Sequence, residues 1–165
     1  MTFQKREMML IDRLEPFLAE LDYSDVVLIA ARGSKTLPYY AVGYDGELDR
    51  WTFVSLGRLP LGNETPTFLY LICFPDWHGE RFAKVGIGLI NRIREHERHG
   101  GEVLHMIELP RWHARIAETM ILADRPVYRP RTPLPQNGDT ECMPWDFGLK
   151  LKLDRYLKQA VAKAH

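Results

Sequence analysis

The amino-acid sequence predicts a mixed α+β protein, in which helices flank a small central three-stranded β-sheet and a helix with a β-meander precedes it. Three observations lead to this fold class. Short aromatic and β-branched runs bounded by Gly, Pro and Asp are typical of strands. Other segments repeat apolar residues at helical spacing. Residues 57–67 carry two prolines and two glycines, and this break divides the chain into expected domains at 1–66 and 67–165.

The first domain is expected to hold one helix followed by three strands. Apolar residues recur at helical spacing over residues 5–22, where Pro16 either bends the helix or starts a second one. The strands are predicted at residues 25–31, 39–45 and 51–57. No motif indicates what this domain does, so three roles remain open: extension of the central sheet, a homodimer contact, and recognition of substrate.

The second domain is expected to alternate strands with helices. Two apolar strands, joined by a hairpin loop at residues 75–80, are followed by a helix, a third strand and a second helix. Four prolines make residues 125–139 an irregular connection, and a last helix closes the chain. The predicted strands are 67–74, 81–87 and 101–109, and the predicted helices are 88–98, 111–123 and 149–165.

Composition narrows the functional classes. The longest apolar runs, residues 26–31 and 68–74, are far too short to span a bilayer. The N-terminus lacks the apolar core of a signal peptide, so a cytoplasmic protein without a membrane partner is expected. Cys73 and Cys142 have no CxxC spacing, which favours reduced structural thiols over a zinc site or a disulfide.

Charge is distributed unevenly along the chain, although the formal net charge is zero. Residues 1–66 hold 10 acidic and 7 basic side chains, whereas residues 77–131 hold 10 basic and 7 acidic ones. A net charge of zero argues against a strongly basic nucleic-acid-binding protein. The basic middle of the chain is either a modest nucleic-acid-binding surface or a set of ordinary solvated helix faces.

Gly86 and Gly88 stand where the second strand of this domain meets the next helix. A dinucleotide-binding fingerprint would place its third glycine at Asn91, and a phosphate-binding P-loop needs a Gly-Lys-Ser/Thr run that is absent. The two glycines are therefore expected to serve a tight strand-to-helix turn.

An ordered set of polar residues surrounds these glycines. Tyr70 lies at the centre of one hairpin strand and Lys84 near the end of the other, and side chains on one face of a hairpin can meet. Arg92 and His96 share one face of the following helix, because they are four positions apart. Glu118 lies among apolar residues of the next helix, so its carboxylate is not expected to be wholly exposed.

The order of these residues resembles the GIY-YIG nuclease superfamily. The family signature is a Gly-Ile-Tyr strand, a Tyr-Ile-Gly strand, an Arg on the following helix and a Glu on the next. The segment "FLY" (68–70) keeps the tyrosine without the glycine, and "KVG" (84–86) has lysine for tyrosine, as in branches with a Lys-Ile-Gly motif. The Arg and Glu segments are matched by "NRIREH" and "ARIAETMIL", and "NGDTECMPW" (137–145) is similar to the Gly-x-Thr-Glu tail of small stand-alone members.

This resemblance covers residues 68–145 and implies a metal-dependent endonuclease that hydrolyses phosphodiester bonds in DNA. Tyr70 would be the general base, with Lys84 beside it to favour the phenolate, and Arg92 would clamp a phosphate oxygen. His96 would bind phosphate or relay a proton. Glu118 would hold one Mg²⁺ or Mn²⁺ ion, because a carboxylate oxygen is a suitable ligand for such an ion.

DNA contacts are expected from basic residues near these positions, because cationic side chains on phosphates supply affinity. The candidates are His78, whose loop is expected to overhang the site, and Arg81, Arg94, Arg98 and Arg115. Each site residue also has a structural interpretation, as a core tyrosine, an ion-paired glutamate or part of a solvated helix face. Two other functions therefore remain open, a non-catalytic nucleic-acid-binding module and a small-molecule enzyme on the same scaffold.

Overall fold

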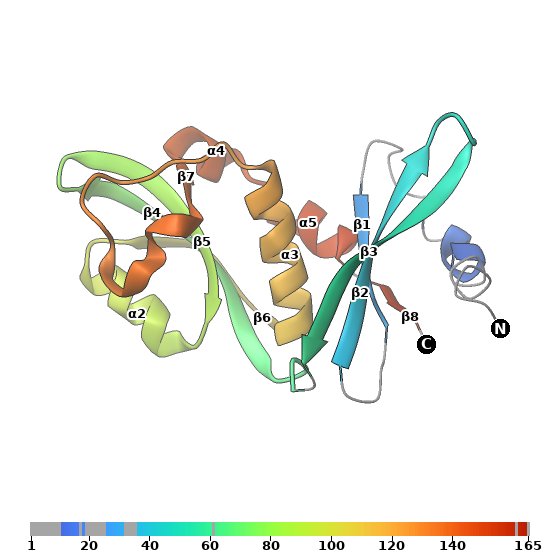
Figure 1. Ribbon diagram of the computed structural model, residues 1–165. Helices are drawn as coiled ribbons and strands as arrows, with labels where there is room; N and C mark the ends of the chain where they lie inside the picture. The colour runs from blue at the N-terminus through green and yellow to red at the C-terminus, as the bar shows by residue number, and fades with distance from the viewer. Residues whose placement is uncertain are drawn as a thin grey trace. The chain divides into compact units, whose positions relative to one another are not determined.

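The computed structural model describes residues 11–16, 18, 26–31, 36–60, 62–160 and 162–164. The chain divides into two compact units, residues 1–63 with 157–165, and residues 64–156. Both contain a β-sheet, so the mixed α+β class is confirmed (Figure 1). The last nine residues group with the first unit, whereas the sequence pattern places them in the second domain.

The first unit is a four-stranded sheet in the order β3-β2-β1-β8. Residues 11–16 and 18 are helical, and the other positions of the predicted helix at 5–22 lie outside the described residues. Leu18 packs with Val27, Ile29, Val42 and Trp51 in the core of this unit. The expected strands are confirmed as β1 (Val26–Ala31), β2 (Thr36–Asp45) and β3 (Arg50–Pro60), and β8 (Ala162–Ala164) runs parallel to β1.

The second unit contains a four-stranded antiparallel sheet in the order β6-β4-β5-β7. Three strands fall where the sequence predicts them, and the fourth, β7, was not expected. β7 is too short to show a pattern in the sequence, and it forms because Cys142–Pro144 pairs with Phe82–Lys84. The four are β4 (Pro66–Trp77), β5 (Glu80–Gly88), β6 (Glu102–Pro110) and β7 (Cys142–Pro144).

The predicted hairpin between β4 and β5 is confirmed, with a two-residue turn. Trp77 pairs with Glu80, and His78 and Gly79 between them have φ angles of 51° and 82°. Two left-handed residues in succession are typical of the turns that join strands with the natural right-handed twist. The Gly79 amide donates to Oδ1 of Asp76 at 3.0 Å, which closes the turn.

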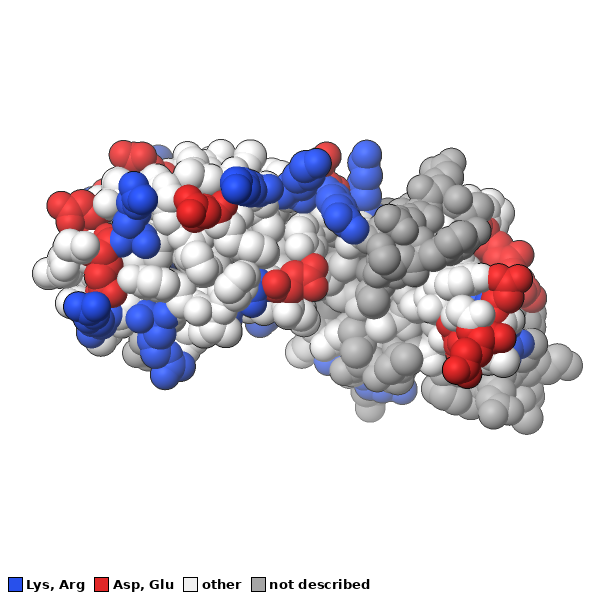
Figure 2. Space-filling view, turned by 90° about the horizontal axis from the view of Figure 1, so that it is seen from above, with Lys and Arg blue, Asp and Glu red and all other residues white. Residues whose placement is uncertain are grey.

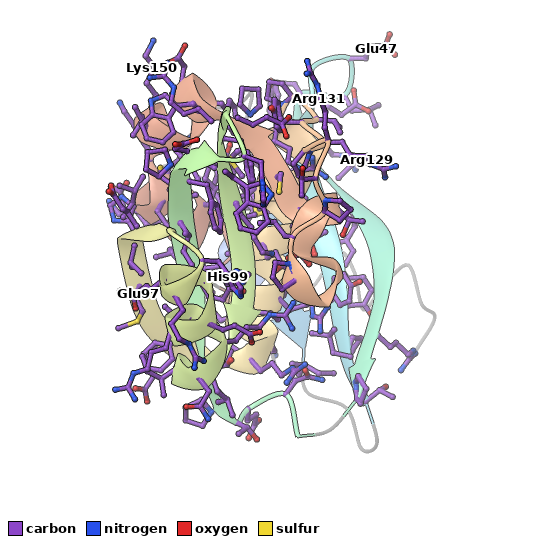
Figure 3. The ribbon with its side chains drawn as sticks, turned by 90° about the vertical axis from the view of Figure 1, so that its left-hand side faces the viewer. Glu47, Glu97, His99, Arg129, Arg131 and Lys150 are labelled. Carbon is purple, nitrogen blue, oxygen red and sulfur yellow. The ribbon has the colours of Figure 1, made fainter. Side chains whose placement is uncertain are left out.

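The two faces of this sheet are covered by different helices. Cross-strand partners share a face, and Tyr70 pairs with Gly86 and Ile72 with Lys84. The side chains of Tyr70, Ile72 and Lys84 therefore project from the same face of the sheet. Helix α2 (Ile90–Arg98) and the 3₁₀ helix η1 (Pro135–Glu141) lie on this side, where Figure 3 looks onto α2 with Glu97 and His99 towards its end. Helix α3 (Arg111–Asp124) packs on the opposite face, against β4 and β5 (Figure 1).

The predicted C-terminal helix at 149–165 is wrong. The chain forms α4 (Trp145–Lys150), an extended residue at Leu151, and α5 (Leu153–Gln159), before β8 pairs with β1. Helix α4 packs closely on β5, where a Cβ atom on Gly148 would lie 2.3 Å from that of Ala83, and β8 pairs with β1 where the pattern predicts more helix. Tertiary contacts thus override the continuous helical pattern.

Among the described residues, no helix is both long and apolar enough to cross a membrane.

Candidate active site

Gly86 and Gly88 lie within β5 and leave space for two side chains of the candidate site. A Cβ atom on Gly86 would approach the Tyr70 hydroxyl oxygen to 2.5 Å, and one on Gly88 would approach Cδ of Arg92 to 3.1 Å. Neither glycine has a positive φ, and strand pairing continues through Gly88. The tight strand-to-helix connection is confirmed, because only Leu89 separates β5 from α2. The glycines, however, do not adopt a left-handed turn but allow close approach of side chains.

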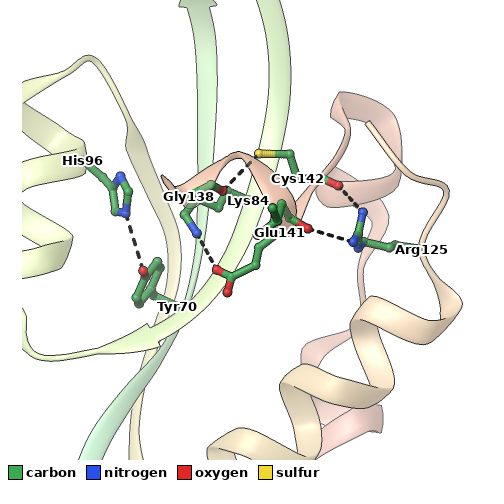
Figure 4. A network of polar contacts seen from close by, with 8 residues as sticks. Tyr70, Lys84, His96, Arg125, Gly138, Glu141 and Cys142 are labelled. Atoms are coloured by element: carbon green, nitrogen blue, oxygen red, sulfur yellow. Dashed lines mark hydrogen bonds and ion pairs between the residues drawn. The ribbon is translucent and has the colours of Figure 1, made fainter. Parts of the chain in front are cut away.

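Tyr70 and His96 form the centre of the site. Tyr70 projects from β4 towards α2, and its hydroxyl oxygen lies 3.5 Å from Nε2 of His96, as the dashed line in Figure 4 marks. Both side chains are buried, with exposed fractions of 0% and 4%. His96 faces the sheet because it lies one helical turn after Arg92, on the buried side of α2.

Burial keeps both groups neutral near pH 7. It raises the pKa of Tyr70 to about 12, although the charge of Arg92 and a hydrogen bond from its side chain act in the opposite direction. Burial, together with the charges of Lys84 and Arg92, lowers the pKa of His96 to about 4. The imidazole is therefore uncharged at neutral pH, and a neutral imidazole can accept a proton at Nε2.

Lys84 is paired with Glu141, an acid for which the sequence predicts no role. Its Nζ atom lies 2.6 Å from Oε2 of Glu141 and 6.0 Å from the centroid of the Tyr70 ring. Lys84 is fully buried, whereas the Glu141 side chain is 30% exposed. Lys84 was expected to favour a Tyr70 phenolate, but its ammonium is directed to the Glu141 carboxylate and the Tyr70 pKa is raised. Arg92 is the cation whose charge and hydrogen bond oppose this rise of the Tyr70 pKa.

Glu118 is a buried carboxylate on α3. It is 5% exposed, and its Oε2 atom has no hydrogen-bond partner within the described part of the chain. Burial and the charge of Glu141 raise its pKa to about 7, against the opposing charges of Arg115, Lys84 and Arg92. Glu118 belongs to α3, which packs on the face of the sheet opposite α2. It interacts with Glu141, Lys84 and Arg92 through their charges.

Arg92 carries a second polar atom without a partner. Its buried Nε atom has no hydrogen-bond partner among the described residues, although Nε–H is a donor. Because Gly88 lacks a Cβ atom, the Arg92 side chain can lie along the strand near Tyr70. The Tyr70 face thus combines a phenol, a neutral imidazole and a guanidinium with an unused donor.

The predicted substrate-binding residues do not gather around Tyr70. His78 occupies the hairpin turn and contacts the Trp77 ring, at a centroid distance of 4.7 Å. It lies eight positions from Tyr70, roughly 25 Å along an extended strand, so it does not overhang the site. Arg81 stacks on the Trp145 ring at 5.0 Å, which commits it to α4.

The other three arginines lie on helix surfaces. Arg94 and Arg98 line an open depression of about 480 Å³ on α2, together with Asn91 and Glu97. Arg115 is exposed on α3, and its charge acts on Glu118. Of the five predicted substrate-binding residues, only the pair on α2 forms a surface cluster.

Glu141 is the residue of this site that sequence reasoning missed. It stands in the "NGDTECMPW" segment, where nothing in the spacing pairs it with Lys84. The signal that could have found it was Lys84 itself, because a lysine inside an apolar strand needs an anion when it is buried. Gly138, in the same segment, leaves room for Lys84, since a Cβ atom there would lie 2.9 Å from the lysine Cε.

The residues fit a cation site of few protein ligands. The described chain contains no group of three His, Cys, Asp or Glu side chains that could enclose a metal ion. The orphaned Oε2 of Glu118 is nevertheless a suitable single ligand for Mg²⁺, which usually keeps several waters and binds one or two carboxylates plus substrate phosphate.

No protein-family model, no curated protein and no solved structure matches this chain.

Proposed function

We propose that the second unit is a metal-dependent endonuclease that hydrolyses phosphodiester bonds in DNA. The observation that carries this proposal is the buried contact between the Tyr70 hydroxyl and the neutral His96 ring, with Arg92 beside it. A tyrosine that only packs in a core does not need a histidine and an arginine beside its hydroxyl group. Their types match the needs of phosphodiester hydrolysis, which are a base for water and donors for a negatively charged transition state.

Tyr70 and His96 would act together as the base. A phenol whose pKa is near 12 is protonated at neutral pH and cannot take a second proton while it keeps its own. As the Tyr70 oxygen accepts a proton from the attacking water, its hydroxyl proton passes to Nε2 of His96, 3.5 Å away. The water oxygen then forms the new bond to phosphorus while the bond to the departing oxygen breaks. The departing alkoxide takes a proton from solvent water, and His96 releases its proton to solvent, which restores the Tyr70–His96 pair.

Arg92 would bind a non-bridging phosphate oxygen. Its Nε–H is buried without a partner in the described structure, and guanidinium donors suit phosphate geometry. Such a donor also stabilises the extra charge that develops on the phosphate during attack. The same charge acts on Tyr70, so one arginine serves both the base and the phosphate.

Glu118 would hold the Mg²⁺ or Mn²⁺ ion through its orphaned Oε2 atom. Such an ion, when bound, supplies Lewis-acid stabilisation of charge on the phosphate oxygens. The raised pKa of Glu118, about 7, means that the carboxylate becomes available as a ligand only near and above neutral pH.

The DNA backbone would lie across α2. Arg94 and Arg98 line the open depression on this helix and would contact backbone phosphates away from the bond that is cut. On the face of the second unit shown in Figure 2, basic side chains are separated by uncharged surface and acidic side chains. A dispersed charge of this kind predicts modest, salt-sensitive binding.

Cleavage of plasmid DNA with and without Mg²⁺ or Mn²⁺ tests the proposal. We expect nicking that needs the metal and falls about 100-fold or more in Arg92→Ala, which loses a transition-state donor. Glu118→Ala should abolish the response to metal. Glu108→Ala, at an exposed position on β6, is the matched control and should cut normally. Absence of cleavage of any DNA by the folded wild type would refute the proposal.

A non-catalytic nucleic-acid-binding module is the second candidate. The complete burial of Tyr70 and Lys84 favours it, because a catalytic base must reach water and substrate. This alternative predicts salt-dependent DNA binding that is unchanged in Glu118→Ala, with no cleavage under any metal condition.

A further inference from the structure

Arg125 donates hydrogen bonds to two backbone carbonyl groups, one on each side of Glu141. Its Nη1 atom donates to the carbonyl oxygen of Cys142 at 2.7 Å, and its Nη2 atom donates to that of Thr140 at 3.0 Å (Figure 4). A guanidinium is a rigid planar fork, so two simultaneous hydrogen bonds fix the spacing and the orientation of the two carbonyls. The backbone of Glu141, which lies between these two carbonyls, is thereby fixed in orientation.

The segment that Arg125 holds is also attached to Lys84. Cys142 pairs with Lys84 between β7 and β5, and the Cys142 thiol contacts the Gly138 carbonyl oxygen at 3.6 Å. Glu141 Oε2 completes the attachment at 2.6 Å from Lys84 Nζ. Arg125, which directly follows α3, therefore joins that helix to the β7 segment at the edge of the sheet.

The ion pair needs such a support. Lys84 is fully buried, and a buried ammonium without its carboxylate is strongly unfavourable. Glu141 is partly exposed, so a free side chain could turn to solvent, where a carboxylate is well hydrated. Arg125 limits that freedom by fixing the backbone from which the Glu141 side chain projects. The Lys84 charge in turn contributes to the neutral state of His96.

We propose that Arg125 is a positioning residue, which holds Glu141 against Lys84 and so keeps the Lys84 ammonium beside Tyr70 and His96. Its effect on cleavage rests on the proposed nuclease function, whereas its effect on the ion pair does not. A residue that only tied α3 to β7 would stabilise the fold equally whether or not Glu141 carried a carboxylate.

The first test measures coupling between Lys84 and Glu141 by denaturant unfolding of the full chain. Unfolding constants of wild type, Lys84→Met, Glu141→Gln and the double variant give the coupling, which we expect to be about tenfold or more. The same cycle is repeated with Arg125→Lys, which keeps the charge but cannot bridge two carbonyls, and the coupling should be lost. Arg129→Lys, exposed on the same connection and labelled in Figure 3, should preserve it. Coupling that survives in Arg125→Lys would overturn the proposal.

The second test uses cleavage of DNA under the same conditions. Arg125→Lys should lower kcat about tenfold or more, because it disturbs the Lys84 charge beside Tyr70 and His96. KM should not change, because no substrate contact is lost. Glu141→Gln should do the same, and the double variant should be no slower than Glu141→Gln alone. If the kcat loss of the double variant equalled the product of the two single losses, Arg125 would act independently of Glu141, and the proposal would be overturned. If the wild type cuts no DNA, the nuclease function fails, and the unfolding cycle still decides the role of Arg125.

Discussion

Gly86 shows how strictly one residue can be required in this site. Its pairing with Tyr70 places the tyrosine ring across the strand, and the ring lies where a side chain would begin. The closest atoms would be the hydroxyl oxygen and Cζ of Tyr70, at 2.5 and 2.6 Å. Burial of the tyrosine on this glycine raises its pKa and brings it to His96, so the glycine shapes the chemistry of the site.

Gly86→Ala should therefore be destabilising. Overpacking a close contact in a core costs roughly 1–3 kcal/mol, and Tyr70 would have to leave its position near His96. Chemical denaturation with a urea series measures the loss. Gly43→Ala is the matched strand control, because no atom lies within 4 Å of its added Cβ. Equal small effects of the two substitutions would contradict the packing described for Tyr70.

Glu118 makes stability depend on pH. Its pKa is about 7 in the folded protein, against an ordinary value of 4.5, so the folded chain binds the extra proton between these values. Stability contributed by protonated Glu118 is complete below pH 4.5 and is lost as the pH rises through 7. Glu118→Gln cannot ionise, so its stability relative to wild type should increase from pH 5 to pH 8 by up to about 3 kcal/mol.

Unfolding in a chelating buffer at these two pH values measures the change for Glu118→Gln. A constant difference between variant and wild type would show that the carboxyl has an ordinary pKa.

At the scale of elements, the β4–β5 hairpin and helix α2 can be predicted from residue spacing along the chain. Alternation along β4 and β5 places Tyr70 and Lys84 on one face, and the four-residue spacing places Arg92 and His96 on one side of α2. β7, the pairing of β8 with β1, and the Glu141 pair follow from contacts between distant segments. No local pattern encodes such contacts, which explains why these features were missed.

Helix α4 depends on one close contact with β5. The Cβ atom of Gly148→Ala would lie 2.3 Å from the Cβ of Ala83, so α4 would have to move off the strand. We expect a loss of roughly 1–3 kcal/mol in the free energy of unfolding. Adding Ala83→Gly removes the opposing atom, so the double variant should recover part of that loss. A double variant that shows the simple sum of both effects would contradict this packing.

At the scale of the whole molecule, the chain is two sheet-containing units, and all residues named for the candidate site belong to the second, residues 64–156. The first unit holds the acidic part of the sequence and none of the residues named for the site. Its three possible roles from the sequence, sheet extension, dimer contact and substrate recognition, stay predictions. The chemistry proposed for the protein depends on the second unit alone.

The rate of plasmid nicking by wild type and Tyr70→Phe, with DNA bound equally to both and Mg²⁺ present, tests the nuclease proposal most directly. The substitution removes only the hydroxyl that contacts His96 and leaves the ring on Gly86. We predict that the nicking rate falls by about 100-fold to 10,000-fold, as for loss of a general base. Equal rates for the two proteins would contradict the central role of Tyr70.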